Sequence, residues 1–242
     1  MATVVLVRHG RSAANVAGIL AGRQVGVSLD EVGRAQAVRA GERLAGVRVV
    51  EIVSSPLERC RQTAAAIAAA QPERPHRRTD RGINECDYGE WQGRALKTLA
   101  KEPLWRTVQD QPSGAAFPGG ESLSAMQARA VAAIRRRDAL IEAEHGPGAV
   151  WVAVSHGDII KSLLADALGM HLDLFQRLHV DPASVSIVRY TGARPVVLGL
   201  NTHAGELAWL TPPQGKKGRP GAHAKAGDAP VGGGAGPGST SR

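Results

Sequence analysis

A short apolar run near the start of the chain ends abruptly in polar residues. Residues 4–7 read Val-Val-Leu-Val, and Arg8, His9 and Gly10 follow at once. A continuous β-branched run of this kind is typical of a strand buried on both faces of a parallel sheet. Such a strand delivers the next residues to the carboxyl edge of the sheet, where α/β proteins bind ligands. Taken alone, an Arg-His pair at this point fits a solvated turn equally well.

The same design occurs a second time in the chain. Residues 149–155 form an apolar run ending in serine, His156 and Gly157 follow, and a helical pattern begins at Asp158. If the two strands are parallel neighbours, their ends lie roughly 5 Å apart, close enough for two imidazoles to hold one phosphoryl group. Arg8 would add a fork of charged donors, and Gly10, which lacks a Cβ, would let its N–H approach the anion.

Strand and helix patterns alternate through most of the chain, which predicts a mostly parallel sheet with helices on both faces, a three-layer α/β/α fold. The helix after the second strand is expected to start at Pro56 with Ser55 as its N-cap. Residues 85–120 have a weaker pattern and are predicted to be a lid inserted over the strand ends. The expected strands are 47–54, 76–79, 149–155, 184–190 and 195–200, the last two forming a hairpin, and the expected helices are 30–44, 56–70, 101–109, 121–145 and 158–168.

The carboxyl-terminal residues differ in composition from the rest. Residues 211–242 contain nine glycines and five prolines and almost no large apolar side chain, so this tail is predicted to be disordered. Its five basic residues against one aspartate carry +4 of the net charge of +8 of the whole chain. Residues 1–210 are therefore predicted to be a single, only mildly basic domain.

Charge, aromatic and cysteine patterns bear on partners and compartment. Scattered arginines and few aromatic residues argue against a nucleic-acid partner, because neither a basic stripe nor a stacking platform is visible. No apolar run approaches the roughly 18 residues of a membrane helix, and the amino terminus does not resemble a signal peptide. Cys60 and Cys86 lack a CxxC spacing, which suits reduced thiols and a cytoplasmic location.

Four blocks of the sequence together resemble one family. Residues 6–15 (Leu-Val-Arg-His-Gly-Arg-Ser-Ala-Ala-Asn) are similar to the RHG signature of the histidine phosphatase superfamily, also called phosphoglycerate mutase-like. Residues 54–64 resemble its second arginine block, residues 85–93 its acid/base segment, and residues 154–157 its second histidine block. The resemblance extends over residues 3–205, and it implies a metal-independent phosphatase that needs no cofactor.

The resemblance also implies roles for individual residues. His9 would be the nucleophile that becomes a phosphohistidine, and Glu85 would donate and accept the proton, with Asp87 and Glu90 as the alternative carboxylates. Arg8, Arg59 and His156 complete the expected catalytic set. The expected substrate-binding residues, in chain order, are Arg8, Gly10, Asn15, Gly22, Arg59, His156 and Gly157.

The residues themselves support this chemistry. A phosphomonoester dianion repels nucleophiles, and two guanidinium groups and an imidazole can neutralise that charge without a metal. Neutral His9 can attack phosphorus, and the leaving alkoxide then needs a proton. Nearby arginines would lower the pKa of Glu85, whereas burial and the bound dianion would raise it. We expect the best turnover under mildly acidic conditions.

Two other functions stay open at this point. Related mutases carry Lys where Leu96 stands, Ser or Thr where Ala21 stands, and paired arginines near Arg106, and their absence here favours hydrolysis. A non-catalytic module that binds a phosphorylated protein or RNA is the third reading. The expected partner is a small phosphorylated metabolite, and the sequence leaves its identity and a homodimer open.

Overall fold

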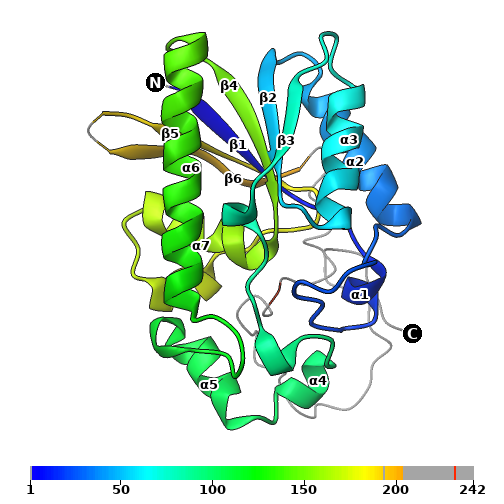
Figure 1. Ribbon diagram of the computed structural model, residues 1–242, viewed down its shortest axis with the longest axis vertical. Coiled ribbons are helices and arrows are strands. Elements are labelled where there is room, and N and C mark those ends of the chain that lie inside the picture. The colour runs from blue at the N-terminus through cyan, green and yellow to red at the C-terminus, as the bar shows by residue number, and fades with distance from the viewer. Residues whose placement is uncertain (1, 193, 204–231, 233–242) are drawn as a thin grey trace, which may run out of the picture.

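A six-stranded sheet with helices on both faces forms the body of the protein (Figure 1). The computed structural model describes residues 2–192, 194–203 and 232. The strand order is β3-β2-β4-β1-β5-β6. The strands are β1 (Thr3–Arg8), β2 (Val49–Ser54), β3 (His76–Thr79), β4 (Val150–Ser155), β5 (Val185–Tyr190) and β6 (Pro195–Thr202).

The sheet is parallel over its first four strands and antiparallel at the other edge. β1 pairs with β4, β4 with β2 and β2 with β3, all in parallel. β5 is antiparallel to β1 and forms the expected hairpin with β6. The predicted mostly parallel α/β fold is therefore confirmed.

Alternate residues of the central strands face two separate cores, as the two-residue strand period requires. Val4 and Leu6 pack with residues of α6 (Leu123–His145) and α7 (Gly157–Ala167) in one core. Val5 and Val7 pack with residues of α2 (Glu31–Leu44) and α3 (Glu58–Ala69) in the other. Figure 1 shows α2 and α3 on one side of the sheet and α6 and α7 on the opposite side.

Two predicted helix starts have different outcomes. Asp30 caps α2 by accepting a hydrogen bond from the N–H of Gly33 at 2.7 Å, which agrees with the helix expected at 30–44. The expected start of α3 at Pro56 is wrong: α3 begins at Glu58, and its N-cap Leu57 makes no side-chain cap. The hydroxyl of Ser55 is 2.8 Å from His156 Nε2 and also accepts the N–H of Leu57 at 3.4 Å.

The stretch between β3 and α6 adds small elements at the carboxyl ends of the strands (Figure 1). α5 occupies the place of the helix expected at 101–109, and the short α4 was not expected. Trp91 and Phe117 are buried, with ring centroids 5.3 Å apart, and they extend the core that Val4 and Leu6 form with α6 and α7. These elements are η1 (Arg81–Ile83), η2 (Gly89–Trp91), α4 (Leu96–Leu99), α5 (Pro103–Asp110) and η3 (Pro112–Gly114); α1 (Ala13–Val16) and η4 (Leu172–Arg177) lie elsewhere in the chain.

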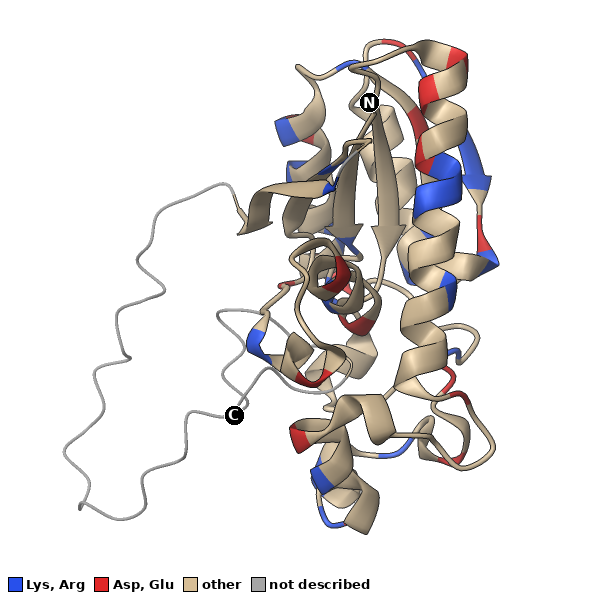
Figure 2. Ribbon diagram, turned by 90° about the vertical axis from the view of Figure 1, so that its left-hand side faces the viewer, with Lys and Arg blue, Asp and Glu red and all other residues tan. Residues whose placement is uncertain are grey.

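Charged residues tie the edge of the sheet to the longest helix. Figure 2 shows basic residues on β3 and along α6. The side chain of Glu51 on β2 is 4% exposed, and it binds Arg78 at 3.2 Å and the Nε of Arg137 at 2.7 Å. A buried carboxylate satisfied from two elements fixes their relative position. No helix in the described part of the chain is long and apolar enough to cross a membrane.

The predicted disordered tail, residues 211–242, lies outside the described residues except for Gly232. Gly232 is far from the rest of the described chain in sequence but not in space. It lines the pocket described next, where it contacts residues of β1 and α7.

Candidate active site

Two strand-His-Gly sequences meet at one edge of the sheet. Because β1 and β4 are parallel neighbours with Arg8 opposite Ser155, the histidines that follow them are brought together. The rings of His9 and His156 lie 5.2 Å apart between centroids, in an edge-to-face arrangement. Both side chains are buried. The spacing expected from neighbouring parallel strands is confirmed.

The hydrogen bonds of His9 decide which ring nitrogen is free to react. Its Nδ1 lies 2.7 Å from the carbonyl oxygen of Gly10, which can only accept, so Nδ1 carries the proton. The lone pair is then on Nε2, which faces Arg59. Burial and the charges of Arg59 and Arg8 hold the pKa of His9 well below its usual value. The imidazole is therefore neutral and nucleophilic over the physiological pH range.

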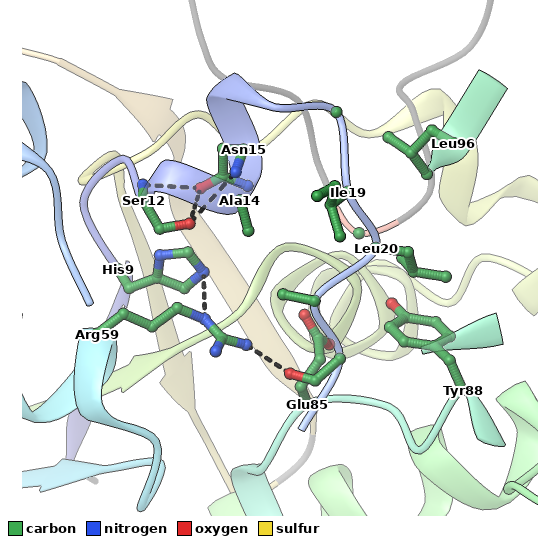
Figure 3. Close-up of a pocket in the computed structure, with 14 residues that line it drawn as sticks. His9, Ser12, Ala14, Asn15, Ile19, Leu20, Arg59, Glu85, Tyr88 and Leu96 are labelled. Carbon is green, nitrogen blue, oxygen red and sulfur yellow. Dashed lines mark hydrogen bonds between the residues drawn. The ribbon is translucent and has the colours of Figure 1, made fainter. Parts of the chain in front are cut away.

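Arg59 of α3 contacts both histidines, and Figure 3 shows its hydrogen bond to His9. Its Nε donates to His9 Nε2 at 3.3 Å, and its Nη2 lies 2.7 Å from the carbonyl oxygen of Gly22 and 3.2 Å from His156 Nδ1. The Nη1 of Arg59 is buried and has no hydrogen-bond partner among the described residues. A buried charged donor of this kind needs an acceptor, and an anion beside His9 supplies one.

His156 is a neutral imidazole with a defined orientation. Its Nε2 donates to Ser55 Oγ at 2.8 Å, because that hydroxyl itself donates to Asn84. Its Nδ1 faces Arg59 and lies 3.7 Å from Glu85 Oε2. Burial and Arg59 lower the pKa of His156. A bound dianion opposes both effects and would favour a proton on Nδ1.

The second arginine approaches the site from the end of β1. Arg8 is 1% exposed and donates from Nη1 to the carbonyl oxygen of Val180 at 2.8 Å. Burial lowers its pKa to about 10, which still leaves it charged at neutral pH. Two buried guanidinium groups beside two neutral histidines make this corner positive, as binding of a phosphoryl group requires.

Glu85 faces the histidines from the inserted stretch. Its Oε1 accepts the N–H of Cys86 at 3.0 Å, which leaves Oε2, the oxygen nearer His156, to carry a proton. Burial and the negative charge of Asp158 raise the pKa of Glu85 to about 7, outweighing Arg59 and Arg8. The carboxyl is therefore poised to give and take a proton near neutrality.

The alternative carboxylates do not share this position. Asp87 pairs with Arg23 at 3.1 Å, and its side chain is 38% exposed. Glu90 is exposed. Of the three carboxylates in this segment, only Glu85 lines the pocket.

A pocket of about 40 Å³ is lined by His9, Arg59 and Glu85 and has room for a few water-sized atoms (Figure 3). Of the other expected substrate-binding residues, Asn15 and Gly22 line it, whereas Arg8 and His156 do not. The Oδ1 of Asn15 accepts the N–H and hydroxyl of Ser12 in a capping box at the start of α1. The complete lining is His9, Ser12, Ala14, Asn15, Gly18, Ile19, Leu20, Ala21, Gly22, Arg59, Glu85, Tyr88, Leu96 and Gly232.

Two predicted substrate-binding glycines have other tasks. The N–H of Gly10 donates to Thr63 Oγ1 at 3.1 Å, so it is not available to an anion as expected. A Cβ on Gly10 would lie 2.3 Å from the carbonyl oxygen of Gly33, so the glycine permits the close approach of α2. Gly157 begins α7 directly after His156 and does not line the pocket.

A set of residues around Glu85 was missed by the sequence analysis. The carbonyl oxygen of Glu85 accepts from Arg23 Nε at 2.8 Å and from Arg129 Nη2 at 3.0 Å. Arg129 also donates to the carbonyl oxygens of Gly82 and Asn84. Glu121 binds both arginines. No sequence pattern marks these residues, because the arginines act on backbone oxygens far away in the chain.

A second missed group lies at the start of α7. Asp158 and Lys161 are buried and 2.9 Å apart, and Asp158 accepts the hydroxyl of Tyr88 at 2.7 Å. Charged residues within the largely apolar pattern of 158–168 were the available signal. In the described ranges, no three His, Cys, Asp or Glu side chains gather closely enough to hold a metal ion.

Fold and site together define an α/β protein with two buried histidines and two buried arginines at the carboxyl edge of its sheet. The chain belongs to the histidine phosphatase superfamily (branch 1), whose family model matches residues 4–203.

Comparison with known proteins shows which members it is similar to. It is 34% identical over 215 residues to the probable phosphoglycerate mutase GpmB of Proteus mirabilis, covering 87% of this chain and 96% of that protein. It is 32% identical over 211 residues to phosphoserine phosphatase 1 of Hydrogenobacter thermophilus, covering 86% and 96%. A mycobacterial glucosyl-3-phosphoglycerate phosphatase, solved as a complex with VO3, superposes with a TM-score of 0.74 at 28% identity, covering 83% and 99%.

Proposed function

We propose that the protein is a metal-independent phosphatase that hydrolyses small phosphomonoesters through a phosphohistidine on His9. The single observation that carries the proposal is that His9, Arg59 and Glu85 line one pocket. His9 offers Nε2, Glu85 offers a protonatable Oε2, and Arg59 offers an Nη1 that has no hydrogen-bond partner among the described residues. Membership of the superfamily supports it.

The first half-reaction transfers the phosphoryl group to the protein. Nε2 of His9 attacks phosphorus, an N–P bond forms, and the P–O bond to the alcohol breaks. Glu85 gives its proton to the departing oxygen, and Arg8 and Arg59 stabilise the charge on the remaining phosphoryl oxygens. The alcohol leaves and Glu85 is left ionised.

The second half-reaction returns the protein to its starting state. A water molecule attacks phosphorus while the carboxylate of Glu85 accepts a proton from it, and the N–P bond breaks. Inorganic phosphate leaves, and Glu85 is protonated again. The raised pKa of Glu85, about 7, suits it to both roles.

A phosphoglycerate mutase is the second candidate, because a relative at 34% identity is named a probable phosphoglycerate mutase. Ala21 and Leu96 line the pocket at the positions where related mutases carry a hydroxyl and a lysine. An apolar lining gives no partner to a substrate carboxylate or a second phosphate, so we favour hydrolysis.

The test is a panel of phosphomonoesters assayed for phosphate release by the wild type and by His9→Ala, with His76→Ala as a control because His76 is exposed. We expect release only with an intact His9, together with a phosphoprotein that is stable in alkali and labile in acid. Comparable turnover by His9→Ala contradicts the mechanism. Interconversion of phosphoglycerates that outpaces phosphate release identifies a mutase.

A further inference from the structure

The carboxylate of Asp158 lies behind the pocket and is bound by a backbone donor from the end of the chain. We propose that Asp158 recognises a hydroxyl or amide N–H on the alcohol portion of the substrate, at the place that the N–H of Gly232 occupies here. This inference rests on the proposed phosphatase function and narrows its substrate class.

Asp158 is held rigidly enough to act as a recognition group. Its Oδ1 lies 2.9 Å from Lys161 Nζ, and its Oδ2 accepts the Tyr88 hydroxyl at 2.7 Å. Lys161 is fixed in turn by Gln176 at 2.6 Å and by the ring of Phe175, 4.7 Å from Nζ. All of these side chains are buried. A carboxylate with fixed neighbours selects ligands by position, because it does not adjust to them.

The second hydrogen bond to Asp158 Oδ2 shows what kind of substrate group could bind there. The N–H of Gly232 donates to it at 3.0 Å, and the carbonyl oxygen of Gly232 lies 3.5 Å from Arg8 Nη2. The backbone of one residue therefore spans the distance from Arg8 to Asp158. An ionised carboxylate only accepts hydrogen bonds, so any group that replaces this N–H must also be a donor.

The spacing within Gly232 defines where the donor must be. The nitrogen and the carbonyl oxygen of one residue are separated by three bonds, N–Cα–C=O. An ester oxygen and a hydroxyl oxygen on the neighbouring carbon are also separated by three bonds, O–C–C–O. A phosphomonoester with a donor on the carbon next to the ester carbon can thus reach Arg8 and Asp158 together.

The rest of the pocket sharpens this selectivity. Ile19, Leu20 and Leu96 line the same space and offer only apolar side chains. A donor at the place of the Gly232 N–H has Asp158 Oδ2 as its acceptor, and an analogue without a donor leaves that lone pair unsatisfied. Because Asp158 keeps Tyr88 and Lys161, we expect discrimination of about 10- to 100-fold rather than more.

The first experiment needs only the wild-type chain. The kcat/KM for 2-hydroxyethyl phosphate is compared with that for propyl phosphate, which replaces the hydroxyl by a methyl group of similar size. We expect the hydroxyl ester to be preferred by about 10- to 100-fold. Equal values overturn the role of Asp158 and leave the phosphatase in place. Failure to release phosphate from any ester of the wider panel overturns the proposed function itself.

Variants then locate the preference. In Asp158→Asn, Lys161 holds the amide oxygen, so the NH₂ group faces Gly232 and the acceptor is lost. We expect the ratio of the two kcat/KM values to fall close to one. Asp166→Asn, on the same helix and paired with Arg135 at the surface, is the matched control and should keep the wild-type ratio. A folded Asp158→Asn protein that keeps the preference overturns the proposal.

If substitution of Asp158 prevents folding, a variant of Gly232 gives a test in which Asp158 is unchanged. Gly232 has a φ of +73°, and a Cβ there would lie 2.9 Å from Leu20 Cδ1, so Gly232→Ala displaces the peptide unit. We expect a several-fold lower KM for 2-hydroxyethyl phosphate, because the competing N–H is removed. An unchanged or raised KM contradicts the view that substrate and Gly232 share one place.

Discussion

The two sides of the pocket are constructed differently. On the phosphate side, His9 and His156 follow adjacent parallel strands, and their positions are fixed by sheet pairing. On the alcohol side, Glu85 lies in a loop whose carbonyl oxygen is held by Arg23 and Arg129. The first side needs only regular secondary structure to form. The second depends on a few side chains from distant segments, and it is where we expect substitutions outside the pocket to affect catalysis.

The largest effect is expected on the phosphate side, from Arg59→Ala. It removes the bonds to both histidines and the buried donor without a partner. We expect a loss in kcat/KM of about 10³-fold, because one preorganised charged donor contributes effects of this size. Arg61→Ala, on an exposed position of the same helix, is the control and should be nearly silent. Similar losses of kcat/KM in both variants would contradict a specific role for Arg59 in the site.

The next effect tests proton donation from the alcohol side. Glu85→Gln keeps the shape but loses the proton, so we expect kcat for alkyl phosphates to fall by about 10²- to 10³-fold. An aryl ester such as nitrophenyl phosphate should lose less, because its alcohol leaves without protonation. In the wild type, activity is expected below about pH 7 and lost as pH rises through the pKa of Glu85. A pH profile with its maximum well above neutrality contradicts this assignment.

A smaller effect is expected from outside the pocket. Arg129→Gln removes the bonds to the carbonyl oxygens of Gly82, Asn84 and Glu85. We expect kcat to fall about 10- to 100-fold through misplacement of Glu85, while vanadate inhibits as well as before because the phosphate side is intact. Arg135→Gln, on the surface of the same helix, is the control. If vanadate affinity falls together with kcat, the two sides of the pocket are not separable.

The smallest expected effect is on stability, and it tests the burial of Glu85 on the alcohol side of the pocket. The pKa of Glu85 is raised in the folded protein from 4.5 to about 7, so its contribution to stability is present below the lower value and lost as pH rises through the upper one. At pH 8 Glu85→Gln should therefore be more stable than the wild type, by at most about 3 kcal/mol in unfolding free energy, and should unfold at a higher temperature. At pH 4 we expect little difference between the two proteins. Thermal unfolding at the two pH values measures it, and equal midpoints at pH 8 contradict it.

Strand ends explain why much of the site could be predicted. Residues 4–7 and 149–155 are marked by composition alone, and sheet pairing then places His9 beside His156. Arg59 and Glu85 came from resemblance to a family. The hydroxyl of Ser55 was assigned to a helix cap because its neighbour is a proline, whereas a buried histidine provides the partner that it binds.

The missed residues share a physical cause. Arg23 and Arg129 act on main-chain oxygens, and a carbonyl group is the same in every residue, so no residue type reveals the contact. Gly10 was misread for the related reason that a missing Cβ serves helix packing as readily as anion binding. Asp158 and Lys161 are charged residues in a largely apolar helix, which made them visible in the sequence. Only the structure shows the hydrogen bonds of Asp158 to Tyr88 and Gly232.

The place of β4 in the sheet governs when this protein can become functional. β4 lies between β1 and β2, although both precede it in the chain. A growing polypeptide therefore has no continuous sheet until residue 155 has been synthesised, and the first strand waits without its central neighbour. Until then the apolar residues of β1 and β2 lack the strand that lies between them in the folded sheet.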